Sequence, residues 1–211
     1  MAMLIYALLL CLASWSVDAT GRNRSDYVGS IQPYTYTSWG SWGNTDWCTE
    51  GSYAYGFTLK VEGKQGKGDD TALNGIKLLC RTYCGALSHS ITSSVMIFGN
   101  WQQTKNCPVG SFLKGAWVRS ERQGSGDNTA VNNYDFLCQH FHYKSHIYHL
   151  QGNGMSWGSW TARQECPTGS YICGLKTQVE PERGTDKDDT ALNDAVFYCC
   201  RFRKTNCSGR R

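Results

Sequence analysis

A pattern of about sixty residues occurs three times in this chain of 211 residues, and this repetition constrains the fold more than any other feature. The cysteines that open the copies lie 59 residues apart, at Cys48, Cys107 and Cys166. Each copy continues through a Gly-Ser dipeptide to an Asp-rich motif, and eleven positions after the first Asp of that motif stands Cys80, Cys138 or Cys199. A period of this length indicates one supersecondary unit per copy, each burying apolar surface against its neighbours. An enzyme needs one active site, so a feature present in all three copies more often belongs to the scaffold.

The N-terminus resembles a secretory signal. Residues 4–12 are apolar but far shorter than the roughly 20 residues that span a bilayer. Val17-Asp18-Ala19 places small residues at the spacing of a signal-peptidase site, so we predict a signal peptide over residues 1–19 and a secreted domain over 20–211. The alternative is a buried N-terminal strand or helix. No later stretch is apolar enough for an anchor, and we expect no membrane partner.

Cysteine usage also indicates an oxidising compartment. Removing Cys11 with the signal leaves ten of the eleven cysteines, an even number suited to five disulfides. Symmetry between the copies pairs Cys48–Cys80, Cys107–Cys138, and Cys166 and Cys173 with Cys199 and Cys200 in an order that the sequence leaves open. For the remaining Cys84 and Cys207, a fifth bridge that ties down the tail and a crosslink between molecules are both open.

Glycosylation motifs and charge give further indications. Acceptor sequons begin at Asn23 and Asn206. The net charge is +4, and basic residues concentrate near the C-terminus, from Arg201 to Arg211. In a secreted protein such a tail favours acidic glycans or mucins over nucleic acid. A solvated tail without a partner is the alternative.

The apolar pattern predicts an all-β protein. Odd positions are apolar over residues 51–62, and even positions are small or polar, as in a strand with one buried face. Residues 110–121 and 169–180 repeat this pattern, although Lys114 interrupts it. With turns formed by Gly, Asn, Asp and Ser, we expect about four strands in each of three repeats, at about 27–85, 86–145 and 146–203.

Large aromatic residues recur at two equivalent positions before each opening cysteine: Trp39, Phe98 and Trp157 at one, and Trp42, Trp101 and Trp160 at the other. We predict that they converge on a threefold centre and form a shared core. The alternative is a set of platforms on which sugar rings stack. Propellers typically need four to eight blades, so three units favour a prism of three sheets.

The Trp-Gly-x-Trp, Gly-Phe-x-Leu-Lys-Val-Glu and Gly-Asp-Asp-Thr-Ala-Leu-Asn-Gly motifs resemble those of the vitelline membrane outer layer protein 1 family, over essentially the whole mature chain. The resemblance implies a β-prism I fold, with three Greek-key sheets about a pseudo-threefold axis as in jacalin-type lectins. It also implies a secreted structural protein of an extracellular coat, such as the egg vitelline envelope. Cys84 and Cys207 depart from the usual cysteine set of that family, and the basic tail is longer than expected.

The Asp-rich motifs supply the candidate glycan-binding residues: Asp69, Asp70, Asn74, Asp127, Asn128, Asn132, Asp188, Asp189 and Asn193. Such side chains also hydrogen-bond nearby backbone N–H groups and fix turns, and we favour this structural role. Calcium is a third use, but it takes six to eight oxygens and each motif alone supplies too few.

Two further kinds of site are considered. Glu62, Glu121 and Glu180 end equivalent strands, and a carboxylate facing an Asp motif would suit glycoside chemistry, which the resemblance extends to transferase-like action on N-acetylglucosamine oligomers. Threefold repetition without one distinct pair argues against catalysis. The histidines between the second and third repeats have no defined ligand spacing, and we expect no metal or cofactor: His140, His142, His146 and His149.

The sequence therefore predicts a secreted structural or glycan-associating protein of an extracellular coat. Its expected partners are extracellular glycans or mucin-like glycoproteins and other coat proteins, without nucleic acid. The alternatives are a weak glycosyltransferase-like enzyme and a dedicated lectin.

Overall fold

The computed structural model describes residues 24–64, 71–123, 129–182, 190–204 and 207. The predicted signal peptide and both sequon asparagines lie outside these residues. Within the described residues the structure is built from strands in three antiparallel sheets of five strands each, which confirms the all-β, β-prism I prediction. No helix in the described part of the chain is long and apolar enough to cross a membrane.

Two sheets are continuous in sequence. The first contains β4 (Ser52–Val61), β5 (Leu73–Thr82), β6 (Leu87–Thr92), β7 (Asn100–Trp101) and β8 (Lys105–Asn106). The second contains β9 (Ser111–Ser120), β10 (Val131–His140), β11 (Ile147–Gln151), β12 (Ser159–Trp160) and β13 (Gln164–Glu165). In both, the long central strands pair with each other, and two short strands pair with the outer side of the first long strand.

The third sheet joins the two ends of the chain. It contains β14 (Ser170–Val179) and β15 (Leu192–Arg201), together with β1 (Tyr27–Ile31), β2 (Ser41–Trp42) and β3 (Asp46–Trp47). β1 pairs with β15, and β2 and β3 pair with β14. The N-terminal strands therefore complete the sheet that the C-terminal hairpin begins, and the sheets are offset from the repeats drawn on the sequence.

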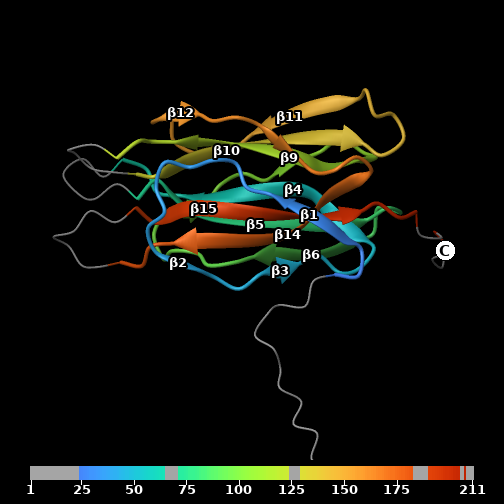
Figure 1. Cartoon of the computed structure of the whole chain (residues 1–211), viewed down its shortest axis with the longest axis horizontal. Helices are drawn as coiled ribbons and strands as arrows, with labels where there is room; N and C mark the ends of the chain where they lie inside the picture. Colours follow the sequence, from blue (N-terminus) through green and yellow to red (C-terminus); the bar gives the residue numbers. More distant parts are fainter. Residues whose placement is uncertain (1–23, 65–70, 124–128, 183–189, 205–206, 208–211) are drawn as a thin grey trace, which may run out of the picture.

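The long strands of all three sheets run along the long axis of the molecule (Figure 1). We call the end where β4, β9 and β14 finish the hairpin end, and the end where they begin the tail end, because the described C-terminal residues lie there (Figure 1). Ten residues in each strand separate the two ends by about 33 Å.

The core between the sheets is filled by residues of the central strands, not by the repeated tryptophans. Phe57, Phe136 and Phe197 are fully buried, and the Phe136 ring centroid lies 4.5 Å from that of Phe57 and 5.2 Å from that of Phe197. The prediction that the repeated aromatic residues form a shared core is wrong for four of the six, which are exposed: Trp39 at 47%, Trp42 at 38%, Trp101 at 37% and Trp160 at 36%. Trp157 is half-buried, and only Phe98 of this set packs against the main core. Trp42, for example, stands on a two-residue edge strand outside the core, where a side chain cannot reach the axis.

Each first long strand contains a β-bulge, which changes the predicted alternation. In β4 the register shifts between Ala54 and Gly56, so Tyr55 is the extra residue. Tyr53 therefore packs in an aromatic cluster at the tail end, whereas Ala54 and Phe57 both lie in the main core. A bulge inserts one residue and so exchanges the two faces of a strand. Lys114 and Cys173 are the equivalent residues of β9 and β14.

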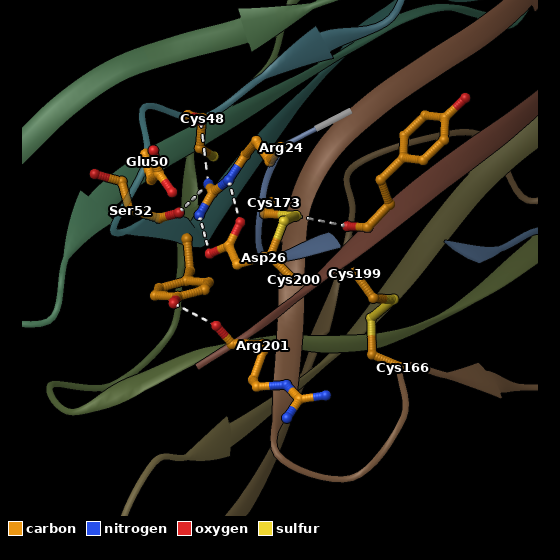
Figure 2. Close-up of a disulfide and its surroundings, with 12 residues drawn as sticks. Arg24, Asp26, Cys48, Glu50, Ser52, Cys166, Cys173, Cys199, Cys200 and Arg201 are labelled. Atoms are coloured by element: carbon orange, nitrogen blue, oxygen red, sulfur yellow. Dashed lines mark hydrogen bonds and ion pairs between the residues drawn. A yellow bond between two sulfur atoms is a disulfide. The ribbon is translucent and has the colours of Figure 1, made fainter. Parts of the chain in front are cut away.

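Five disulfides link the described cysteines: Cys48–Cys80, Cys84–Cys207, Cys107–Cys138, Cys166–Cys199 and Cys173–Cys200. The structure thus gives the order that the sequence leaves open. Cys199 lies in the main core and its neighbour Cys200 in the tail-end cluster, because adjacent residues of a strand point to opposite faces (Figure 2). Cys84–Cys207 attaches the tail to the turn between β5 and β6.

Candidate functional site

Three equivalent hydrogen-bonded groups lie at the hairpin end, one in each sheet. In the first, the Thr71 hydroxyl donates to Glu62 Oε2 over 2.6 Å, and Asn74 Nδ2 donates to Thr71 Oγ1 over 2.8 Å. The same donors and acceptors join the other two groups. The second consists of Glu121, Thr129 and Asn132, and the third of Glu180, Thr190 and Asn193. Each glutamate predicted as a candidate acid therefore accepts a hydrogen bond from a threonine of its own repeat.

The asparagines of these groups have a structural role. Asn74, Asn132 and Asn193 have no exposed surface, and a buried side chain cannot contact a glycan at the surface. We therefore remove these three residues from the candidate glycan-binding set. The remaining members of that set lie outside the described residues: Asp69, Asp70, Asp127, Asn128, Asp188 and Asp189.

The alanine within each motif is held in the left-handed region of backbone conformation. The φ angles of Ala72, Ala130 and Ala191 are 49°, 50° and 48°. Each alanine carbonyl accepts a hydrogen bond from the N–H of the glutamate in its group. This conformation costs about 1–2 kcal/mol for a residue with a Cβ, and here the surrounding hydrogen bonds hold it in place.

Exposed tryptophans stand beside cations at the same end. Lys77 Nζ lies 4.2 Å from the ring centroid of Trp101. The corresponding distances are 5.6 Å from Lys176 Nζ to Trp42 and 5.9 Å from Arg119 Cζ to Trp160. Each indole keeps more than a third of its surface exposed, so each sheet presents one aromatic ring next to a positive charge.

The loops that carry these tryptophans are fixed to the long strands. Lys60 Nζ donates to the carbonyls of Met96 and Ile97 over 2.6 and 2.7 Å. Arg119 Nε and Gln178 Nε2 hold the equivalent loops in the other sheets. These bonds order the backbone before any ligand arrives, so the exposed rings form pre-organised surfaces.

One glycine in each of these loops allows the close approach. Gly99 has a φ of 69°, and a Cβ there would lie 2.4 Å from the carbonyl oxygen of Val61. Gly40 and Gly158 contact the ends of β14 and β9 in the same way. The Trp-Gly-x-Trp motif thus requires glycine because the loop backbone lies against the strand backbone.

One of the four histidines, His140, stabilises a turn at the tail end. His140 Nδ1 accepts hydrogen bonds from the backbone N–H groups of His142 and Tyr143, both over 3.1 Å. His149 lies apart from them, with its ring 5.0 Å from that of Trp117. Over the described ranges there is no group of three or more His, Cys, Asp or Glu side chains that would hold a metal ion.

Comparison with known proteins shows the family to which this chain belongs. The sequence profile described as Vitelline membrane outer layer protein I (VOMI) matches residues 30–202. The chain belongs to this family. It is 40% identical over 206 residues to the human vitelline membrane outer layer protein 1 homolog, covering 95% of this chain and 96% of that protein. The mouse homolog is 41% identical over 178 residues, covering 82% and 84%.

Solved structures show the same fold at low sequence identity. Single-chain recombinant jacalin superimposes with a TM-score of 0.53 at 11% identity, covering 85% of this chain and 98% of jacalin. Calystegia sepium agglutinin gives a TM-score of 0.51 at 11% identity, covering 82% of this chain and 96% of the agglutinin. The family membership and the β-prism I architecture agree with the predictions from the sequence.

Proposed function

We propose that this protein is a secreted carbohydrate-binding component of an extracellular coat, and that its exposed tryptophans contact the glycan. One observation carries the proposal: Trp42, Trp101 and Trp160 are exposed to nearly the same extent, at 38%, 37% and 36%, on three equivalent loops. The same exposure on three equivalent loops is a repeated feature and not a scattered one, and sugar rings present apolar faces that stack on aromatic rings.

Other observations support this setting. Five disulfides suit an extracellular compartment, and the predicted signal peptide over residues 1–19 would deliver the chain there. The family takes its name from an egg coat layer. Calsepa lectin, whose fold matches with a TM-score of 0.51, has been solved with a biantennary N-glycan. Mucin-like glycoproteins and other coat proteins are the partners that we propose.

Binding is favoured over catalysis by the geometry. Three equivalent surfaces bind a repeating polymer with an avidity that exceeds the affinity of one surface. The glutamates of the three hydrogen-bonded groups each accept a hydrogen bond from the threonine of their own repeat, and the one that differs, Glu180, is more buried and accepts a second bond from the Thr190 N–H, as expected of a structural carboxylate.

The test is binding of the purified protein to a glycan array, to mucin and to N-acetylglucosamine oligomers. Replacing Trp42, Trp101 and Trp160 together by alanine should weaken binding at least tenfold, since each exposed stacking contact contributes about 0.5–1.5 kcal/mol. The control replaces Leu87 and Val109, which are 74% and 89% exposed at the tail end. Equal binding by the tryptophan variant and the wild type would contradict the proposed contact surface.

A further inference from the structure

The tail end is rich in basic residues that have no acidic partner. After Asp194 the chain contains no Asp or Glu up to its last residue. Arg201, Arg203 and Lys204 are exposed there, and Lys144 is exposed on the turn before β11. None of these four side chains forms an ion pair with any residue that the structure describes.

These cations surround one aromatic residue at the end of the prism. The ring of Phe202 lies 5.4 Å from that of Tyr53, 5.5 Å from Tyr171 and 5.4 Å from Phe141. Tyr53 and Tyr171 are the same position in two repeats, so Phe202 covers the tail end of the pseudo-threefold axis. Phe202 is thereby fixed over the centre of this end.

Hydrogen bonds hold the basic residues around Phe202. The Tyr53 hydroxyl donates to the Arg201 carbonyl over 2.8 Å and accepts from the Arg203 N–H over 2.9 Å. Lys144 Nζ donates to the Tyr171 hydroxyl over 2.8 Å. Cys84–Cys207 anchors the chain just beyond Lys204. These bonds fix the Lys144 ammonium and the backbone from which the side chains of Arg201, Arg203 and Lys204 project.

The acidic residues of this end do not neutralise that surface. Asp26 is 4% exposed and pairs with Arg24, whose Nη2 lies 2.7 Å from Asp26 Oδ2. Figure 2 shows Arg24 directed at Asp26 and at the carbonyls of Cys48 and Ser52. The Arg201 side chain extends away from the Arg24–Asp26 pair. Glu50 is exposed and accepts a hydrogen bond from the Ser25 hydroxyl, so it keeps its negative charge, but the other turns at this end contain no Asp or Glu: residues 83–87, 107–111, 140–147 and 166–170.

The hairpin end has a different charge balance. In the sequence, the segments 60–71, 119–129 and 176–190, which lie partly outside the described residues, each contain as many acidic residues as basic ones, or more. Lys77, Arg119 and Lys176 stand beside the tryptophans, but the sequence around them also contains acidic residues, so a polyanion is attracted more strongly to the tail end.

We propose that the tail end is a second binding surface, specific for a polyanionic glycan chain that carries sulfate or sialic acid groups. Lys144, Arg201, Arg203 and Lys204 make the ionic contacts. One molecule then joins an anionic chain at this end to the stacked sugar rings at the other. This inference rests on the proposed function for its setting, but the two surfaces can fail separately.

The experiment measures binding of the full secreted chain to heparin and to desulfated, N-acetylated heparin at several salt concentrations. One variant carries Arg201→Ser, Arg203→Ser and Lys204→Ser. Its control removes the same charge elsewhere through Lys64→Ser, Lys105→Ser and Arg122→Ser. We expect heparin binding that weakens with salt, at least tenfold lower affinity for the tail variant, and a change within twofold for the control.

Three outcomes would contradict the inference, and a fourth separates it from the proposed function. Equal losses in both variants would mean that only net charge matters. Binding that ignores desulfation, or that favours an oligonucleotide or phosphatidylserine vesicles over heparin, would assign the surface to another class of partner. If the tail variant loses heparin but the tryptophan variant still binds N-acetylglucosamine oligomers, the proposed hairpin-end contact fails and the tail-end inference stands.

Discussion

Replacing Lys114 by methionine removes a buried cation whose three hydrogen bonds connect two sheets. Lys114 is 4% exposed, and its Nζ donates to the carbonyls of Cys166, Pro167 and Ser170 over 2.6, 2.7 and 3.2 Å. Methionine has a similar length and preserves most of the packing of the side chain. The substitution therefore isolates the loss of the donor.

The magnitude follows from the number and quality of these bonds. A hydrogen bond from a charged donor contributes about 1.5–3 kcal/mol, and two of the three bonds are short. Burial lowers the pKa of Lys114, so the cost of desolvating the ammonium offsets part of that energy. We expect Lys114→Met to lower the free energy of unfolding by about 2–3 kcal/mol, and the melting temperature by roughly 5–10 °C.

Urea and thermal unfolding, followed by circular dichroism with the disulfides intact, measure the effect. The control is Lys105→Met, at a half-buried lysine of β8 whose side chain donates to no described residue, and its change should stay within about 0.5 kcal/mol. A Lys114→Met protein as stable as the wild type, or more stable, would refute the reasoning that the turn carbonyls depend on this donor.

Two further changes test the tail and a buried acid. Replacing both Cys84 and Cys207 by serine opens a loop with a sequence separation of 123 residues. Urea titrations should show a free energy of unfolding lower by about 2–4 kcal/mol. An unchanged midpoint would contradict a role for the bridge in holding Phe202. Burial raises the pKa of Asp194 in the folded protein, so the ionised carboxylate is less favourable in the folded state than in the unfolded one. The free energy of unfolding therefore falls as the pH rises from the ordinary aspartate range through the raised pKa. Asp194→Asn, which copies Asn133 of the second repeat, should be more stable than the wild type at pH 7 by unfolding assays, with the difference disappearing below the ordinary aspartate range.

Much of the fold follows from the sequence because it depends on periodicity. The 59-residue spacing gives three units, and the period-two apolar pattern gives strands. The prediction for the repeated aromatic residues failed because periodicity does not determine whether a side chain points to the axis or to the outside. Equivalent positions such as Trp42 and Trp101 must share an environment, but repetition alone does not say whether that environment is the axis or the outer edge.

The bulges and the cations explain the other differences. A bulge at Tyr55 exchanges the faces of β4, and the local signal for it is the glycine that follows the bulge in each copy, Gly56, Gly115 and Gly174, which the alternation alone does not take into account. Three turns are held by Arg24, Arg81 and Lys114, which occupy unrelated positions of their repeats, so sequence alignment of the copies does not find them. Lys77 was missed as the partner of Trp101 for the same reason, since its equivalents are Asp135 and Val196.

The direct test of the account is the response of the indole N–H signals to a glycan in a ¹H–¹⁵N NMR titration, with signals assigned by single Trp→Phe variants. N-acetylglucosamine oligomers or mucin glycans should shift the signals of Trp42, Trp101 and Trp160 together. The signal of Trp47, whose Nε1 is buried, should stay in place. Shifts confined to other residues, with these three indoles unchanged under saturating glycan, would contradict the claim that the exposed tryptophans form the binding surface.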